Sequence, residues 1–273
     1  MNLRLTLRGD RSKGLLLAVA ASLISTASAW ADSELMLAYP TSFGKIQAAT
    51  FDEGRQRVGD ANLEIEKLED GTVRIHAESG VDGGAHTIAT ATLRPIADTN
   101  LLRPVYQQSS SFDADNRPLG TMRIDHTTGE ATCSHPQADG EGMRTQHLPL
   151  PAHDRIANVP LTLLFDPLVK GDVSTVDFQI VLCRYEAKLL DFQAKVVRRD
   201  DATDGGDHLV EVRYGPDFGS VFSLLAKAVV PRLSFWFDPA SSSPWIAHRM
   251  PLYADGPEVF VVRQGIETNT LLD

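Results

Sequence analysis

Few side chains in this sequence have the types and spacing that catalysis needs. His153-Asp154-Arg155 places a carboxylate beside an imidazole, the pair that orients a general base in many hydrolases. No serine or cysteine stands at a spacing that would complete a triad, and the G-x-S-x-G, S-x-x-K and H-E-x-x-H motifs are absent. Asp154 is better explained as an anion paired with Arg155 or as a cap before the following apolar run. We therefore predict no catalytic residue.

The two cysteines, Cys133 and Cys183, form an even pair, which in an oxidising compartment is most simply a disulfide. A metal site is the alternative, because His126 and His135 lie close to Cys133 and soft Cys/His sets hold zinc or copper. Two unpaired thiols are a third possibility. The spacing fits no standard zinc pattern, so we predict the disulfide, no metal and no cofactor.

Two further stretches contain residues that could bind a ligand, but each also has an explanation that needs no ligand. Arg199–Asp207 (RDDATDGGD) can be aligned on a calcium loop, yet its third position would be Ala202, which cannot ligate. A solvated hairpin loop explains it better. Ser234–Pro244, followed by Trp245 and His248, brings aromatic rings near a histidine. That arrangement suits either a ligand site or a hairpin whose inner face joins the core.

Strands must position these side chains, because alternation of apolar and polar residues dominates the chain. Leu63 and Ile65 face one way and the glutamates between them the other, and Asp70-Gly71 then supplies a hairpin turn. Thr127–Glu130 marks a second hairpin. The predicted strands are Ala61–Leu68, Thr72–Glu78, Thr87–Leu93, Val105–Phe112, Thr121–Ile124, Ala131–Cys133, Val176–Leu182, Lys188–Arg198, His208–Tyr214, Leu233–Phe237 and Glu258–Arg263.

Two short apolar helices interrupt the strands. Asn158–Phe165 has Asn158 as a cap and Pro167 as a stop, and Ser220–Val230 carries an apolar stripe that ends at Pro231. We expect both against the concave face of a curved antiparallel sheet or half-open barrel, where they are either ordinary core helices or the wall of a ligand cavity. The ligand-binding candidates are Val221, Leu224, Leu225, Ala228, Leu163, Phe165 and Trp236.

Residues 1–31 are predicted to be an export signal. A basic start leads into the apolar stretch Gly14–Ile24, which is too short to cross a bilayer, and Ala29-Trp30-Ala31 has the A-x-A form that signal peptidase cleaves after Ala31. The mature protein is then expected in the periplasm and is not an integral membrane protein. A formal net charge of −10 argues against nucleic acid as a partner.

Ala49–Ser79, with its Val58-Gly59 pair and the Asp70-Gly71 turn, is similar to the opening of a known family. Leu233–Phe237, Asp238 and Met250-Pro251-Leu252 are similar to its close. The family consists of uncharacterised secreted bacterial proteins grouped only as a domain of unknown function, and the resemblance covers most of residues 45–263. It implies a fold of the lipoprotein-carrier type, a half-open antiparallel barrel plugged by short helices. The family offers no catalytic residues to carry over.

The sequence thus predicts one β domain over residues 32–265 and a frayed tail over 266–273. The leading function is to bind or carry an amphiphilic ligand such as a lipid, acyl chain or lipoprotein tail. A non-enzymatic assembly factor that binds a cell-envelope protein through a sheet edge is the first alternative. A hydrolase is the third, and overall an enzyme is the less expected class.

Overall fold

The computed structural model describes residues 35–137, 142–152, 154–183, 187–200, 209–217, 233–266 and 271, which belong to one compact unit, Glu34–Asp273. Several expectations lie wholly or mostly outside these residues: the export signal, His153, the helix Ser220–Val230 with its candidates Val221, Leu224, Leu225 and Ala228, and the frayed tail over 266–273, of which Ile266 and Leu271 alone are described. Within the described part of the chain, no helix is long and apolar enough to cross a membrane.

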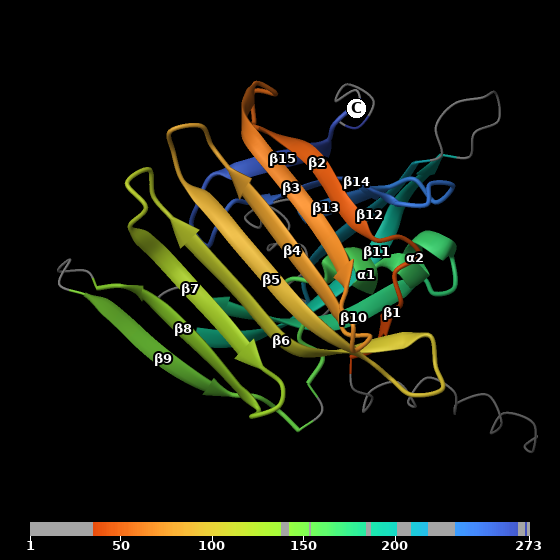
Figure 1. The fold of residues 1–273 in the computed structure, drawn as a ribbon. Coiled ribbons are helices and arrows are strands. Elements are labelled where there is room, and N and C mark those ends of the chain that lie inside the picture. Colours follow the sequence, from red (N-terminus) through yellow and green to blue (C-terminus); the bar gives the residue numbers. More distant parts are fainter. Residues whose placement is uncertain are drawn as a thin grey trace, which may run out of the picture. The chain divides into compact units, whose positions relative to one another are not determined.

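The described residues form one large antiparallel sheet of fifteen strands (Figure 1). The strands are β1 (Leu37–Ala38), β2 (Gly44–Phe51), β3 (Arg57–Lys67), β4 (Val73–Gly80), β5 (His86–Pro95), β6 (Leu101–Phe112), β7 (Pro118–Asp125), β8 (Glu130–Pro136), β9 (Met143–Pro149), β10 (Thr175–Cys183), β11 (Ala187–Asp200), β12 (Leu209–Pro216), β13 (Leu233–Phe237), β14 (Trp245–Pro251) and β15 (Glu258–Arg263). Their spatial order is β10-β11-β12-β13-β14-β15-β2-β3-β4-β5-β6-β7-β8-β9, with β1 paired to β6.

The predicted alternation of strands is confirmed where one face is buried. Leu63 and Val73 are buried on neighbouring strands, and the Asp70-Gly71 turn joins them with Gly71 at φ 82°. Four strands were not predicted from the sequence: β1, β2, β9 and β14. Strand β14 begins with three buried residues in a row, so both of its faces are covered and period-two alternation disappears.

The sheet closes on one side and stays open on the other. Strand β15 pairs with β2, which joins the two halves of the chain, whereas β9 and β10 end the order at opposite edges. The Cys133–Cys183 disulfide crosses this open seam from β8 to β10, with the Cα atoms 5.3 Å apart, which confirms the predicted pairing. The fold class is therefore mainly β, an open antiparallel sheet with the character of an incomplete barrel.

The helical segment after residue 158 differs in detail from the expected single helix. It consists of α1 (Leu161–Leu164) and α2 (Asp166–Lys170). Pro167 does not stop a helix but lies in the first turn of α2, where a missing N–H is tolerated. Asn158 caps neither helix; its side chain instead bonds the backbone of Val181 on β10.

Phe165, at the junction of α1 and α2, lies at the centre of an aromatic cluster. Its ring centroid is 5.9 Å from that of Phe178 and 5.5 Å from those of Tyr214 and Phe235. All four side chains are buried. Burial also raises the pKa of the Tyr214 hydroxyl, which stays neutral. At this position the inner face of the sheet is filled by protein side chains.

Candidate functional site

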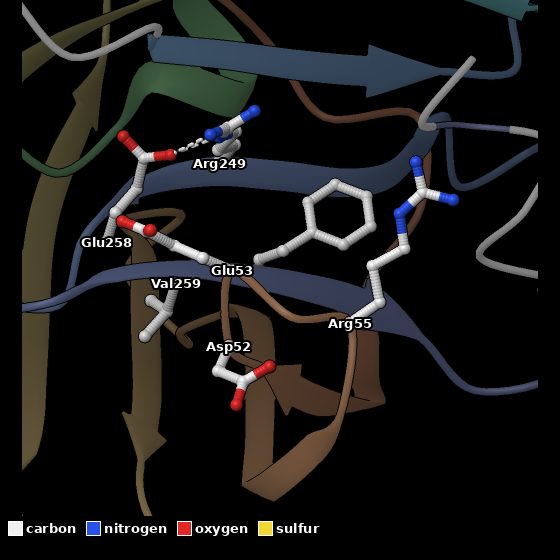
Figure 2. A pocket seen from close by; sticks show the side chains of 7 residues that line it. Asp52, Glu53, Arg55, Arg249, Glu258 and Val259 are labelled. Carbon is white, nitrogen blue, oxygen red and sulfur yellow. Dashed lines mark hydrogen bonds and ion pairs between the residues drawn. The ribbon is translucent and has the colours of Figure 1, made fainter.

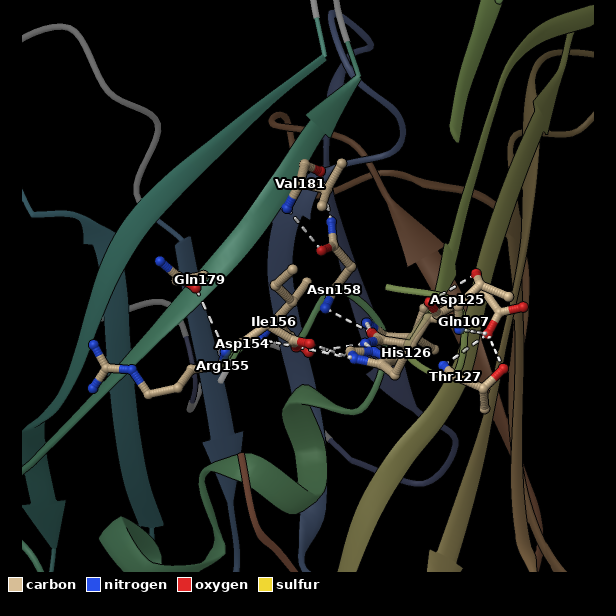
Figure 3. A network of polar contacts seen from close by, with 12 residues as sticks. Gln107, Asp125, His126, Thr127, Asp154, Arg155, Ile156, Asn158, Gln179 and Val181 are labelled. Atoms are coloured by element: carbon tan, nitrogen blue, oxygen red, sulfur yellow. Dashed lines mark hydrogen bonds and ion pairs between the residues drawn. The ribbon is translucent and has the colours of Figure 1, made fainter. Parts of the chain in front are cut away.

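A polar network occupies the open seam, and Gln107 on β6 is its centre (Figure 3). The Gln107 side chain is fully buried and makes four hydrogen bonds. Its Oε1 accepts from the backbone N–H groups of Asn158 and Val159, at 2.8 and 3.0 Å. Its Nε2 donates to the carbonyl of Ile156 at 2.8 Å and faces His126 Nε2 at 2.9 Å. Every donor and acceptor of this amide is therefore used.

These bonds fix the tautomer of His126. Because Gln107 Oε1 faces two N–H donors, the amide cannot be turned over, and its Nε2 is a donor toward the imidazole. His126 Nε2 must then accept, which leaves the proton on Nδ1. Nδ1 donates to the Asp154 carboxylate, 2.9 Å from Oδ1. Both ring nitrogens are engaged, so the His126–Asp154 pair has no nitrogen free to act as a general base.

The network ties the connection between β9 and β10 to both sides of the seam. Ala157 N donates to the carbonyl of Gln179, whose own N–H donates to the carbonyl of Arg155, in a short parallel bridge along β10. Asn158 bonds both the N–H and the carbonyl of Val181. Since Gln107 holds the same segment from β6, these contacts cover the edge of β10 and join it to the opposite half of the sheet.

A pocket of about 290 Å³ opens beside this network. Leu35, Pro104, Val105 and Ala152 give it an apolar wall, and Leu35 is fixed there by a hydrogen bond from its N–H to the carbonyl of Asp154. The polar wall contains Arg94, Arg103, His126, Thr127 and Asp154. The side chains of His126 and Asp154 are 10% and 15% exposed, so the pocket reaches down to the network.

A second pocket, of about 150 Å³, lies between the β2–β3 turn and β14–β15 (Figure 2). Asp52, Glu53, Arg55, Arg249 and Glu258 supply its charged groups. Arg249 forms an ion pair with Glu258, and the carboxylate of Asp52 accepts from the backbone N–H of Gln56. Most of these charged groups already make contacts within the protein, which makes this pocket the weaker candidate.

Of the residues proposed from sequence as ligand contacts, Leu163, Phe165 and Trp236 are described. Leu163 and Phe165 are buried in the main core. Trp236 is in a separate cluster with Phe260, which it meets edge-on at a centroid distance of 5.3 Å. Successive residues of β13 alternate between the two clusters, so Trp236 and Phe165 lie on opposite faces of the sheet and share no site.

His248, which the sequence placed among aromatic residues, does pack there. Its ring lies 5.2 Å from that of Phe235 and 5.7 Å from that of Trp245. Burial lowers the pKa of His248 to about 4, so the ring is neutral at pH 7. Its side chain is half-buried against these rings and lines neither pocket.

The alternative metal site is not formed. Cys133 is in the disulfide, His126 bonds Gln107 and Asp154, and among the described residues no cluster of three or more potential ligands occurs. The Asp200 carboxylate pairs with Arg198 and that of Glu211 with Arg213, while residues 201–208 lie outside the described part.

Sequence reasoning missed Gln107, Arg94, Arg103 and the true partner of Asp154. It paired Asp154 with its neighbour Arg155 or made it a cap for the following run. The structure pairs Asp154 with His126, 28 residues earlier, and its carboxylate also accepts from the N–H of Ile156. None of these residues belongs to a motif. The available signal was the placement of polar residues near predicted strand ends, which selects too many candidates to identify a site.

No family model and no curated protein match this chain. Among solved structures, it is similar to the "beta-barrel-like protein of domain of unknown function DUF1849" from Brucella abortus. The identity is 10% and the TM-score 0.45, over 83% of this chain and 97% of the other. That description agrees in general terms with the resemblance found in the sequence, because both describe an uncharacterised domain of barrel-like β architecture. A likeness at this TM-score supports no argument about function or export.

Proposed function

We propose that this protein is a non-catalytic binding protein and that it holds an amphiphilic ligand in the pocket beside the seam. The observation that carries the proposal is the composition of that pocket, whose lining combines the apolar residues Leu35, Pro104, Val105 and Ala152 with charged side chains. A ligand with an alkyl chain and a polar head group matches both walls at once.

Two findings favour binding at this pocket over the alternatives from sequence. The catalytic candidate from sequence was Asp154 beside His153, which lies outside the described residues, and the structure bonds Asp154 to His126, whose ring nitrogens are both engaged in the seam network. The space beside α1 and α2 is occupied by the Phe165 cluster, so we place the ligand at the seam and not over these helices. Export to the periplasm, with cleavage after Ala31, is part of the same proposal, and the disulfide is in keeping with it.

The test is calorimetric titration of the full chain with dodecyl maltoside and dodecanoate below their micelle concentrations. A tryptophan in place of Ala152 would fill the pocket, and Ala240, exposed in the turn between β13 and β14, gives a matched control. We expect Ala152→Trp to weaken binding by about tenfold or more, while Ala240→Trp stays within about twofold. Equal affinities in both variants, or absence of binding by the unmodified protein to any dodecyl amphiphile whatever its head group, would refute the proposal.

A second function, docking of a cell-envelope protein through a sheet edge, is favoured by the position of β9. It is the outermost strand at its end of the sheet, and Met143, Arg144 and Thr145 at its start are exposed. The β10 edge is covered by Arg155–Ala157, so strand addition would have to use β9. Thr145→Pro should abolish capture of a partner in periplasmic cross-linking. Thr132→Pro cannot serve as its control, because a proline inside the sheet would disrupt β8.

A further inference from the structure

The two arginines of the seam pocket face one another across a strand pair. In the β5–β6 register, Arg94 is the direct partner of Arg103. Side chains at such positions have their Cβ atoms about 5 Å apart, and like charges directly opposite destabilise a sheet. Both side chains nevertheless line the same pocket and are exposed. The fold therefore concentrates two positive charges at one point of its surface.

Neither arginine side chain has an ion-pair or hydrogen-bond partner among the described residues. Arg94 contributes only slightly to lowering the pKa of Asp70, whose carboxylate accepts from the Thr72 N–H instead. The chain has 36 acidic and 26 basic residues, and six other arginines are paired with carboxylates, namely Arg57, Arg74, Arg117, Arg198, Arg213 and Arg249. Arg199 and Arg263 donate instead to backbone carbonyls.

The remaining charged group of the pocket does not neutralise the pair. The Asp154 carboxylate is occupied by His126 Nδ1 and by the N–H of Ile156. With His126 neutral, the pocket wall carries one net positive charge and presents two guanidinium groups, each a planar fork of donors. An anion that accepts from both forks would remove the repulsion between them.

We infer that the pocket binds a phosphate group, and, on the proposed function, that of a phosphorylated amphiphile. A carboxylate has two oxygens and one charge, which satisfy a single guanidinium fork. A phosphate monoester has three oxygens and a charge between −1.5 and −2 near pH 7, so it can accept from Arg94 and Arg103 together. The apolar wall of Leu35, Pro104, Val105 and Ala152 then takes the chain attached to the phosphate.

The experiment compares four probes by calorimetric titration of the full chain: dodecyl phosphate, dodecanoate, dodecyl maltoside and inorganic phosphate. Arg94→Gln and Arg103→Gln each remove one fork. Arg123→Gln is the control, because Arg123 is exposed on β7 and matches the change in net charge without lining the pocket. We expect dodecyl phosphate to bind about tenfold or more tightly than dodecanoate, and each pocket variant to weaken it by about tenfold. Arg123→Gln should stay within about twofold, and added salt should weaken binding.

The outcomes distinguish the inferred phosphate site from the proposed binding of an amphiphile. Equal affinities for dodecyl phosphate and dodecyl maltoside, with no effect of either arginine variant, would overturn the inference but leave the proposed function intact. Inorganic phosphate binding as tightly as dodecyl phosphate, and sensitive to both arginines, would support the phosphate site and refute the amphiphile. Absence of binding by all four probes would overturn both.

Discussion

Replacing Gln107 by leucine tests whether the seam network holds the two edges of the sheet together. The change keeps the side chain's approximate size but removes the partners of three buried backbone groups, the N–H of Asn158, the N–H of Val159 and the carbonyl of Ile156. A buried polar group left without a partner costs about 1–3 kcal/mol. Because such terms are not additive, we expect Gln107→Leu to lower the free energy of unfolding by about 3–5 kcal/mol, or the Tm by about 10 °C.

Gln108→Leu is the matched control. Gln108 is the next residue of β6 and is half-buried, and its amide forms hydrogen bonds with the side chains of Tyr106 and Ser110. Its replacement should cost less than about 1 kcal/mol. Urea unfolding followed by the fluorescence of the buried Trp236 and Trp245 measures both variants. If Gln107→Leu is no more destabilising than Gln108→Leu, the seam network does not contribute as the structure indicates.

Gln107→Glu checks the tautomer of His126 separately from packing. A carboxylate retains both acceptor positions toward Asn158 and Val159 but cannot donate to His126 Nε2. A protonated ring can donate to it instead. Relative to the unmodified protein, we therefore expect this variant to recover stability as the pH falls toward the ordinary pKa of histidine, and to keep that gain at lower pH. A deficit that is independent of pH would contradict the assignment of the proton to Nδ1.

Three other predictions concern stability. Joint replacement of Cys133 and Cys183 by alanine should lower the free energy of unfolding by about 4 kcal/mol, because a cross-link over a separation of 50 residues is lost. Urea unfolding measures this change, and the intact mass of the unmodified protein checks that its disulfide is formed. His248 has a pKa lowered to about 4, so the unfolded chain takes up this proton before the folded protein does as the pH falls from about 6.5. Up to about 3 kcal/mol of the free energy of unfolding should therefore be lost between pH 6.5 and 4. His248→Phe should flatten that part of the curve of stability against pH, and an unchanged slope would refute the assignment. Phe165→Ala should cost about 3–5 kcal/mol without altering dodecyl maltoside binding; a small loss of stability together with altered binding would instead place the ligand at the helices.

The sequence predicted those parts of the fold that depend on local pattern. Leu233–Phe237 and Glu258–Arg263 are strands with the predicted bounds, because turn residues and apolar runs delimit them. Strand β2 was missed, since its first residues are exposed and its burial does not alternate. The expected cap at Asn158 was wrong because a strand distant in the sequence, β10, provides that side chain with backbone partners.

The candidate site was less predictable, because it depends on register between strands. Arg94 and Arg103 face one another only because a bulge at Thr92/Leu93 shifts the β5–β6 pairing by one residue. Gln107 meets Asn158 across 51 positions of the chain. Neither relationship leaves a trace in composition or periodicity, which report on one segment at a time.

The pairing of β15 with β2 has a consequence for the order in which the chain folds. Along the sheet path, the other neighbours are consecutive in sequence and can form as local hairpins while the chain is being made. Strand β2 is complete early, yet the partner of Ala48–Phe51 is Phe260–Arg263, roughly 200 residues later. Throughout synthesis the growing chain therefore presents this strand with an unsatisfied edge, the kind of surface that pairs with other chains. Whatever keeps the nascent protein from associating must act until its last strand has been made.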